Sequence, residues 1–295
     1  MKPKIVLLFA VLIVIAGAYI FFTQRMPHAD AASDAPQIAG PMTSYDSLSA
    51  MNYDSLHAKI VSEFPNAKPG KWGEFVRGVD EDIDTNVKIM ALTFDACGTK
   101  YGDGYNARLV SFLRQEHLPA TIFVTGLWID ANPDTFASLA ADTLFEIENH
   151  GLEHRPCAVC GETEYGIRGT LNVGQAVDEI ELNNRKIKKL TGRRPIFFRS
   201  STAFCDEECV KVAGQLGITI ISYDILSGDA VPHTPAREIA DNILNNARDG
   251  AIVIMHVNHP ESYTLEALRI AIPELRRRGF QFVRLMHHRL KGRYS

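Results

Sequence analysis

The feature that most constrains the fold is the regular alternation of short apolar segments with amphipathic segments after Trp72. Such alternation predicts an α/β fold with a mostly parallel sheet covered by helices. Seven strands over roughly 215 residues suit a barrel better than a small open sheet. The expected strands are Lys88–Asp95, Ala120–Thr125, Phe145–Asn149, Ile196–Arg199, Thr219–Leu226, Ala251–Val257 and Phe280–Leu285. The expected helices are Tyr105–Gln115, Pro133–Ala141, Gly174–Leu190, Glu207–Leu216, Ala236–Ala247 and Leu265–Arg278.

The N-terminus has a different character from this alternating region. An uncharged apolar run of 18 residues extends from Ile5 to Phe22 and follows Lys2 and Lys4. As a helix it would be about 27 Å long, close to the hydrocarbon thickness of a membrane. We therefore expect a transmembrane signal anchor over residues 1–22. The two lysines favour a cytoplasmic N-terminus, with the body of the chain exported to the periplasm. Cleaved secretion, with cleavage after Ala31, is the alternative.

The segment between this anchor and the alternating region is rich in Ala, Ser, Pro and Asp, which is typical of a linker. We expect a linker over residues 23–70, with a short amphipathic helix around Tyr53 to Phe64. The catalytic domain is then expected over residues 71–295. The formal net charge of −4 gives no basic excess, so nucleic acid is not expected as a partner.

Four of the five cysteines form two pairs that are close in sequence, which is compatible with an exported protein. Cys157 and Cys160 form a CxxC, and Cys205 and Cys209 are four residues apart. One CxxC is weak evidence for zinc, because a structural zinc site needs about four ligands. In an oxidising compartment we expect a local disulfide at either pair, which leaves Cys97 unpaired.

Polar residues concentrate where the expected strands end, and in a barrel that is where function gathers. His150 and His154, four residues apart, would lie on one face of a helical turn and could converge on one divalent metal ion. An isolated pair of this kind is as often structural, but the neighbouring strand ends favour a metal. These other strand-end residues are Asp95, Arg199, Asp224, Asp229 and His256.

From Val87 to Leu285 the ordered motifs resemble the polysaccharide deacetylases with a NodB-homology domain. The motifs are Leu92–Asp95, Glu148–His154, Arg193–Arg199, Asp229 and Ile254–His256. The resemblance implies a distorted (β/α) barrel with seven or eight strands. It also implies that Asp95 is the catalytic base, that Arg199 positions it, and that His150 and His154 bind the metal. It further implies that His256 is the general acid, oriented by Asp229.

Several positions depart from the family pattern. Ala96 stands where the family has an Asp that is the third metal ligand. Arg199 is followed by Ser200-Ser201-Thr202 instead of the x-Pro-Tyr of the family. Ala230 replaces an aromatic residue, and Val257 replaces the Asp that commonly follows the acid. Two histidines alone hold a metal weakly, because catalytic zinc generally has three protein ligands.

The third metal ligand stays open at this level. Asp103, in the glycine-rich loop Gly98–Gly104, is the best substitute from sequence, although it could equally be a turn residue. Cys97 as a thiolate and Asp95 itself are the other candidates. The metal is expected to be Zn²⁺, with Co²⁺ or Ni²⁺ as alternatives.

These observations predict a metal-dependent hydrolase that removes N-acetyl groups from amino sugars of a polysaccharide. An anchored enzyme would meet peptidoglycan or an exopolysaccharide close to the membrane. One alternative is a related amidase or esterase with another substrate. Another is a non-catalytic carbohydrate-binding homologue, suggested by Ala96.

Overall fold

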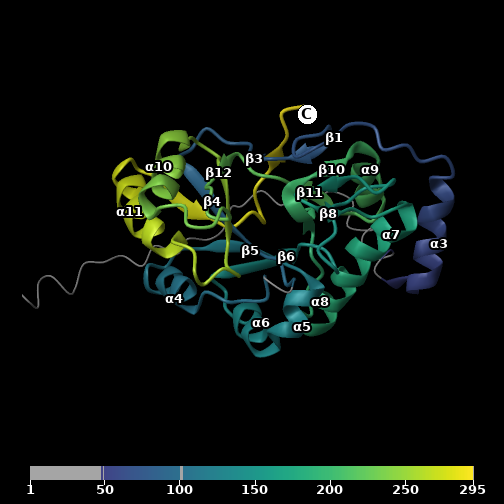
Figure 1. Cartoon of the computed structure of the whole chain (residues 1–295), viewed down its shortest axis with the longest axis horizontal. Helices are drawn as coiled ribbons and strands as arrows, with labels where there is room; N and C mark the ends of the chain where they lie inside the picture. Colours follow the sequence, from purple (N-terminus) through teal and green to yellow (C-terminus); the bar gives the residue numbers. More distant parts are fainter. Residues whose placement is uncertain (1–47, 49, 100–101, 295) are drawn as a thin grey trace, which may run out of the picture. The chain divides into compact units, whose positions relative to one another are not determined.

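A curled parallel sheet forms the centre of the domain (Figure 1). The computed structural model describes residues 48, 50–99 and 102–294. Eight strands pair in the order β12-β13-β4-β5-β6-β9-β11-β2, and β14 pairs with β4. The α/β class predicted from the sequence is confirmed. The strands of this sheet are β2 (Val79–Asp80), β4 (Ile89–Ala96), β5 (Ala120–Val124), β6 (Phe145–Asn149), β9 (Phe197–Phe198), β11 (Thr219–Ile221), β12 (Ile225–Leu226), β13 (Ile252–His256) and β14 (Gln281–Val283).

The central strands are buried along their whole length. Every residue of β4, β5 and β6 is buried. These strands are rich in Ile, Val, Phe and Ala, as expected for parallel strands covered on both faces. The polar residues among them, including Glu146 and Glu148, are hydrogen-bonded inside the sheet. The apolar residues therefore determine where the strands form, and the buried polar residues among them bind partners within the sheet.

Helices surround the outside of the curled sheet (Figure 1). The largest hydrophobic cluster lies between them and the sheet and includes Leu92, Trp128 and Leu268. The helices are α3 (Tyr53–Glu63), α4 (Ala107–Gln115), α5 (Gly126–Ala131), α6 (Pro133–Ala140), α7 (Val173–Val177), the π-helix η1 (Asp178–Leu182), α8 (Asn183–Thr191), the 3₁₀-helix η2 (Ser201–Ala203), α9 (Glu207–Gln215), α10 (Ala236–Asn246) and α11 (Thr264–Arg277).

The residues around β2 close the sheet at the amino ends of its strands. Within the described residues, no pairing joins the outer strands β12 and β2. Asp80 pairs with β11, and two residues later Asp82 bridges Ala251, next to β13. The neighbouring strand β3 (Asp82–Ile83) also pairs with β15 (Leu290–Lys291) near the C-terminus. The two sides of the curled sheet are therefore joined at this end by the Asp82–Ala251 bridge, and not by pairing of β12 with β2. Short two-stranded pairs lie outside it: β1 (Trp72–Gly73) with β10 (Cys205–Asp206), and β7 (Thr163–Glu164) with β8 (Ile167–Arg168).

Two predicted elements differ from the structure. The strand expected over Thr219–Leu226 is two strands, β11 and β12. The Arg199 guanidinium donates to the backbone carbonyl of Ser222 at 2.8 Å, and the Asp224 N–H donates to Ile252 O at 2.9 Å. The chain thus leaves β11, which lies beside β9, and moves to the opposite edge of the sheet, beside β13. The helix expected over Gly174–Leu190 contains the π-helical turn η1, which apolar spacing cannot reveal.

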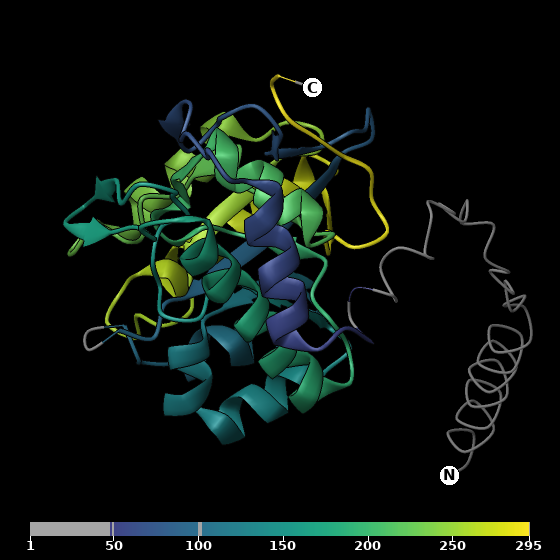
Figure 2. The same cartoon turned by 90° about the vertical axis from the view of Figure 1, so that its right-hand side faces the viewer.

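The helix expected around Tyr53 to Phe64 is confirmed as α3. Its Leu56 and Ile60 are fully buried in a second hydrophobic cluster that includes residues of α7 and α9. Figure 2 shows α3, in purple, lying across the helices on that side of the sheet. The expected linker over residues 23–70 therefore differs from the structure at α3, which is part of the packed domain. The expected anchor over residues 1–22 lies outside the described residues. No helix within the described part of the chain is long and apolar enough to span a membrane.

The cysteines are not joined in the local pairs predicted above, and all five are free thiols. Cys157 bridges Cys205 as a strand neighbour, and its thiol contacts that of Cys209. These three are fully buried, whereas Cys160 is exposed next to Glu162. Distant segments thus bring the buried thiols together, so sequence spacing did not predict their neighbours.

Candidate active site

A buried ion pair lies at the carboxyl end of β4. The Arg199 guanidinium donates to Asp95 Oδ1 and to Thr93 Oγ1, each at 2.9 Å, and it stacks 4.2 Å from the centroid of the Phe123 ring. Arg199 is fully buried and Asp95 is 2% exposed. Arg199 follows β9 and Asp95 ends β4, so the sheet brings together two residues more than a hundred positions apart. The structure therefore pairs these two predicted residues directly.

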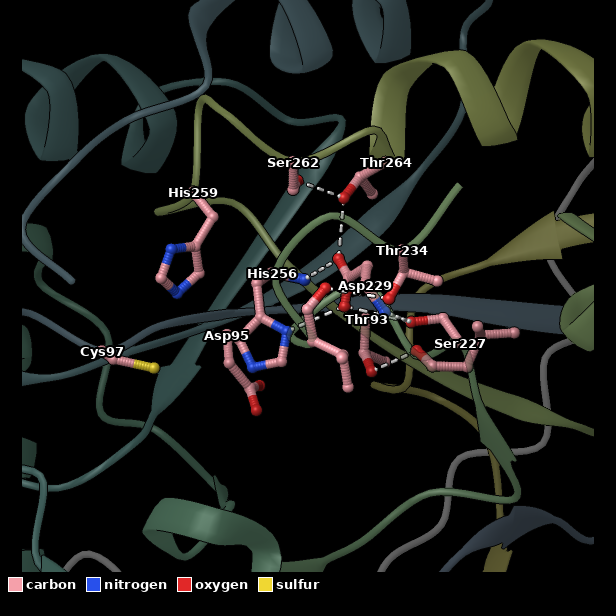
Figure 3. Close-up of polar contacts among 12 residues, drawn as sticks. Thr93, Asp95, Cys97, Ser227, Asp229, Thr234, His256, His259, Ser262 and Thr264 are labelled. Atoms are coloured by element: carbon pink, nitrogen blue, oxygen red, sulfur yellow. Dashed lines mark hydrogen bonds and ion pairs between the residues drawn. The ribbon is translucent and has the colours of Figure 1, made fainter. Parts of the chain in front are cut away.

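A second carboxylate, Asp229, holds His256 at the end of β13. Asp229 Oδ1 accepts from His256 Nδ1 at 2.9 Å, and Oδ2 accepts from the His256 backbone N–H at 2.8 Å. Thr264 and Ser227 also donate to this carboxylate, at 2.8 and 3.1 Å (Figure 3). With four donors around it, Asp229 is fixed. It leaves the Nε2 side of His256 directed away from the carboxylate.

His150 and His154 stand beside the first pair. His150 Nδ1 donates to Arg199 O at 2.8 Å, because a carbonyl can only accept. Its Nε2 is then an acceptor, 3.9 Å from Cys97 Sγ and 3.8 Å from Asp95 Oδ2. The two imidazole rings are 5.1 Å apart, and the Nδ1 of the buried His154 has no hydrogen-bond partner. A hydrogen bond that fixes one ring nitrogen and leaves the other free is the usual arrangement of a metal-ligating histidine.

One group of described residues has the spacing of a metal site, and it contains Cys97. The ligand atoms of Cys97, His150 and His154 all lie within 4.8 Å of one another. The Cys97 sulfur is 3.9 Å from His150 Nε2. An unpartnered buried nitrogen beside a thiol and a free imidazole fits a divalent metal such as zinc. The residues present are thus compatible with a metal ion at this position.

Asp103 is not brought to this group. It is exposed, and the loop around it is fixed by contacts to its backbone. Asn132 donates to Asp103 O at 2.9 Å and Trp128 donates to Gly104 O at 2.9 Å. Asn258 donates to Gly102 O at 3.0 Å. Because side chains of the body bind the loop carbonyls, the loop is anchored without the Asp103 carboxylate. Asp224 is also elsewhere, in an ion pair with Arg248.

The electrostatic environment assigns different protonation states to the two pairs. Burial alone would raise the pKa of Asp95, but Arg199, together with His150 and His256, lowers it below the usual value. Burial alone would lower the pKa of His256, but Asp229 and then Asp95 raise it above the usual value. Asp95 is thus kept as a carboxylate, suited to accept a proton. His256 is kept as an imidazolium, suited to donate one.

His150 and His154 show the opposite behaviour from His256. Burial lowers the pKa of His150, with Asp95 acting against it. Burial, followed by the charge of His150, lowers the pKa of His154 to about 3. Both imidazoles are therefore neutral over the physiological pH range, which is the form that binds metal.

A pocket of about 140 Å³ opens beside Asp229. The small Ala230 side chain is part of its wall, where the resemblance predicted an aromatic residue. His259 stands at its edge, with its ring 5.9 Å from that of His256 (Figure 3). Its Nδ1 is 2.9 Å from Glu261 Oε1. The pocket thus provides open space beside the carboxylate that holds His256. It is lined by Asp229, Ala230, Val231, Pro232, His233, Thr234, His259, Glu261, Ser262 and Tyr263.

Supporting residues of the site were missed in the sequence. Asn149 binds both Asn183 and Asn184 of α8 at 2.7 Å, and Ser227 and Thr264 hold Asp229. The only sequence signal was their polarity in otherwise apolar segments, and polarity alone does not name a partner.

Comparisons with known proteins point to one family. Residues 82–221 match the family described as polysaccharide deacetylase. A peptidoglycan-N-acetylglucosamine deacetylase of Bacillus cereus is 24% identical over 208 residues, which cover 68% of this chain and 88% of the relative.

Two solved structures show the same fold. A CE4 family pseudoenzyme from Bacillus anthracis superposes with a TM-score of 0.57 and 24% identity. The match covers 68% of this chain and 64% of that one, so it spans slightly less than two thirds of the solved chain. A family 4 acetyl xylan esterase from Clostridium thermocellum, solved with a cobalt ion, has a TM-score of 0.55 and 28% identity. It matches 67% of this chain and 88% of its own length.

Proposed function

Because this chain belongs to the polysaccharide deacetylase family, we propose that it is a metal-dependent hydrolase of N-acetyl groups on amino sugars. The linear amide bond of the acetamido group is cleaved, and the products are acetate and a free amine. The observation that carries the proposal is that a basic carboxylate, Asp95, and an acidic imidazole, His256, are register partners on β4 and β13, with the His150–His154 pair beside Asp95. Acid–base chemistry of amide hydrolysis needs both groups in these opposite protonation states.

A divalent ion held by His150 and His154 would polarise the acetyl carbonyl and acidify a water molecule. Asp95 accepts the proton of the attacking water, and Arg199 keeps this carboxylate ionised and oriented. His256 then donates its proton to the departing nitrogen. Asp229 holds His256 in the orientation and protonation state that this step requires.

We propose a cell-envelope or secreted glycan, peptidoglycan or an exopolysaccharide, as the substrate. The name of the Bacillus cereus relative supports peptidoglycan. The expected anchor over residues 1–22 supports a substrate near the membrane, with the catalytic domain in the periplasm. Protease treatment of intact spheroplasts tests this placement. Digestion of the domain is the expected result, and protection would contradict the placement.

The test of the reaction is acetate release by the purified full chain. A panel of N-acetylated glycans is compared with acetylated xylan, an ester substrate. Acetate from at least one N-acetylated glycan, lost in Asp95→Asn and in His256→Ala, is the expected result. Release from xylan alone would instead favour an esterase, a reading that the acetyl xylan esterase neighbour supports. No release from any substrate would favour a non-catalytic homologue, a reading that the pseudoenzyme neighbour supports.

A further inference from the structure

We propose that the thiolate of Cys97 is the third protein ligand of the metal, so that the site is a Cys-His-His site. The inference rests on the proposed function, because it concerns the metal of that site. It replaces the carboxylate expected at position 96 with a sulfur one residue later. The experiment below therefore reads the metal's ligands directly and does not depend on turnover.

The direction of the β4 side chains places Cys97 on the correct side. Successive side chains of a strand point to opposite faces. Asp95 faces Arg199 inside the sheet, whereas Ala96 is fully buried in the main hydrophobic cluster. Cys97, two residues after Asp95, lies again on the side of Asp95 and contacts His150.

The backbone after β4 holds Cys97 there. Thr125 donates its hydroxyl to Cys97 O at 2.8 Å and its N–H to Ala96 O at 3.1 Å. The next residue, Gly98, has φ +73°, and a Cβ at this position would lie 2.2 Å from Trp128 N. Only glycine allows this close approach. The Ala-Cys-Gly sequence thus turns the chain away from the strand while the thiol stays at the site.

The donor atoms have the separation that a small tetrahedral ion requires. Zn–S and Zn–N bonds of roughly 2.3 and 2.1 Å place the two ligand atoms about 3.6 Å apart in tetrahedral geometry. The observed distance between Cys97 Sγ and His150 Nε2 is 3.9 Å. His154 contributes the independent observation, because its buried Nδ1 has no partner. These three residues leave one coordination position for water or substrate.

The competing carboxylates are less suitable. Asp95 Oδ1 is occupied by Arg199 at 2.9 Å, and Asp95 lies outside the group whose ligand atoms are mutually close. Asp103 is exposed and outside that group. A sulfur ligand also predicts the class of metal: thiolates favour zinc and cobalt over the oxygen-seeking ions magnesium, calcium and manganese.

Cobalt substitution of the purified full chain tests the assignment. The cobalt-loaded wild type is expected to show an intense thiolate-to-cobalt charge-transfer band in the near ultraviolet. Cys97→Asp is expected to bind cobalt without this band, because an oxygen then replaces the sulfur. Cys97→Ala is expected to bind zinc about 10–100-fold more weakly, the range seen when a supporting interaction is removed, or weaker still. Cys160→Ser, which alters an exposed thiol away from the site, is the matched control and keeps the band.

The outcomes separate this inference from the proposed function. Stoichiometric cobalt without a charge-transfer band in the wild type would overturn the Cys97 assignment and leave the deacetylase proposal intact. Equal cobalt binding by the wild type and His150→Ala would instead overturn the metal site itself.

A different observation supports a second inference: we propose that Glu179 is a positioning residue for His154. Its carboxylate accepts the backbone N–H groups on both sides of that histidine. The Arg155 N–H binds at 2.9 Å, and the Glu153 N–H lies 3.1 Å from both carboxylate oxygens. Glu179 is 3% exposed. His154 itself has φ +59°, a left-handed conformation that costs a non-glycine residue about 1 kcal/mol or more.

The π-helical turn η1 presents Glu179 to this loop. Such turns add a residue to a helix and are frequent at functional sites. The Leu152 N–H also donates to Glu179 O at 2.9 Å, so side chain and backbone bind the loop together. Gly151 is necessary for the approach, because a Cβ there would lie 2.2 Å from Glu179 Oε1. Glu179 therefore offsets the strain at His154 and keeps its ring in place.

Chelator competition for zinc tests this role. Glu179→Gln places an amide opposite the two N–H groups and is expected to weaken zinc binding about 10–100-fold. Glu181→Gln is the matched control from the same turn. It removes ion pairs with Arg185 and Arg194, at 2.8 and 2.7 Å, instead of hydrogen bonds to the backbone around His154. That control is expected to lower thermal stability and to leave zinc affinity unchanged. Equal zinc affinity of Glu179→Gln and the wild type would overturn the inference, as would an equal loss in both variants.

Discussion

The Asp229–His256 pair and the Cys97–His150–His154 group lie at the same end of the sheet but differ in how their polar atoms are satisfied. Asp229 receives four hydrogen bonds, and the pair needs no further partner. In the second group, His154 Nδ1 is buried without a partner. The Asp229 carboxylate is satisfied by protein donors, whereas the Cys97–His150–His154 group has donor atoms available to a ligand. A buried polar atom without a partner is costly, and His154 Nδ1 lies beside a thiol and a second imidazole, a set of donors that fits a metal ion.

Asp95 lies between these two regions and could belong to either. Its substitution is therefore expected to have the largest effect on activity. Asp95→Asn removes the proton acceptor, and kcat is expected to fall about 10²–10⁴-fold with the metal content unchanged. Acetate release and metal analysis of the same preparation measure both quantities. Loss of the metal together with activity would show that Asp95 is a ligand and would break the distinction drawn above.

Removing the partner of Asp95 is expected to affect folding. Arg199→Met leaves a buried carboxylate unpaired and should cost about 3–5 kcal/mol of unfolding free energy. The pKa of Asp95 is lowered in the wild type, so its contribution is present above about pH 4 and is lost as the pH falls through the folded-state pKa. The difference between variant and wild type should therefore shrink in acid. Urea denaturation at neutral and acidic pH measures it.

Arg237→Met is the control for this experiment. Arg237 pairs with Asp241 and both side chains are exposed, so the expected loss is about 1 kcal/mol or less. A loss as large as that of Arg199→Met would mean that burial does not distinguish the two arginines.

The effect of Asp229 on His256 is tested by the pH dependence of kcat. Asp229→Asn removes the charge that raises the pKa of His256, so the protonated imidazole is lost at lower pH. The basic limb of the kcat profile should therefore move to lower pH, with about a 10²-fold loss on the alkaline side. Metal content should not change. An unshifted basic limb would show that another group limits the alkaline rate.

The smallest effect is expected at Asp103. Asp103→Asn should leave zinc affinity and kcat unchanged, because this exposed side chain is not brought to the metal group. Chelator competition measures the affinity. Weaker zinc binding by this variant would mean that Asp103 belongs to the metal site and that the third ligand lies in the loop.

The sequence predicted the strands and strand ends well because burial on both faces leaves an unmistakable apolar run. β4 and β6 appear within one residue of their expected positions, and their ends carry Asp95 and His150. Local alternation also implies that Cys97 and Asp95 share a side. It could not decide between Cys97 and Asp103, because the path of a glycine-rich loop depends on contacts with distant residues such as Asn132 and Asn258.

Other features depended on contacts far apart in the chain. The break between β11 and β12 follows from the hydrogen bond of Arg199 to Ser222, and no local pattern encodes it. The expected disulfides failed for the same reason: spacing suggested Cys157 with Cys160, whereas the fold places Cys157 beside Cys205. Glu179 looked like an ordinary acidic residue of a helix until the π-turn directed it inward.

The bridge at the amino end of the barrel has a consequence for the order in which the chain folds. β3 pairs with β15 across more than two hundred residues, and Asp82 also bridges Ala251. Contacts between distant residues form slowly, because a long loop must close before they gain any stability. The strands β4, β5 and β6, whose ends carry Asp95 and His150, can therefore assemble on nearer neighbours during synthesis. The closure that binds the two ends of the domain together is a late event, completed only after Lys291 has left the ribosome.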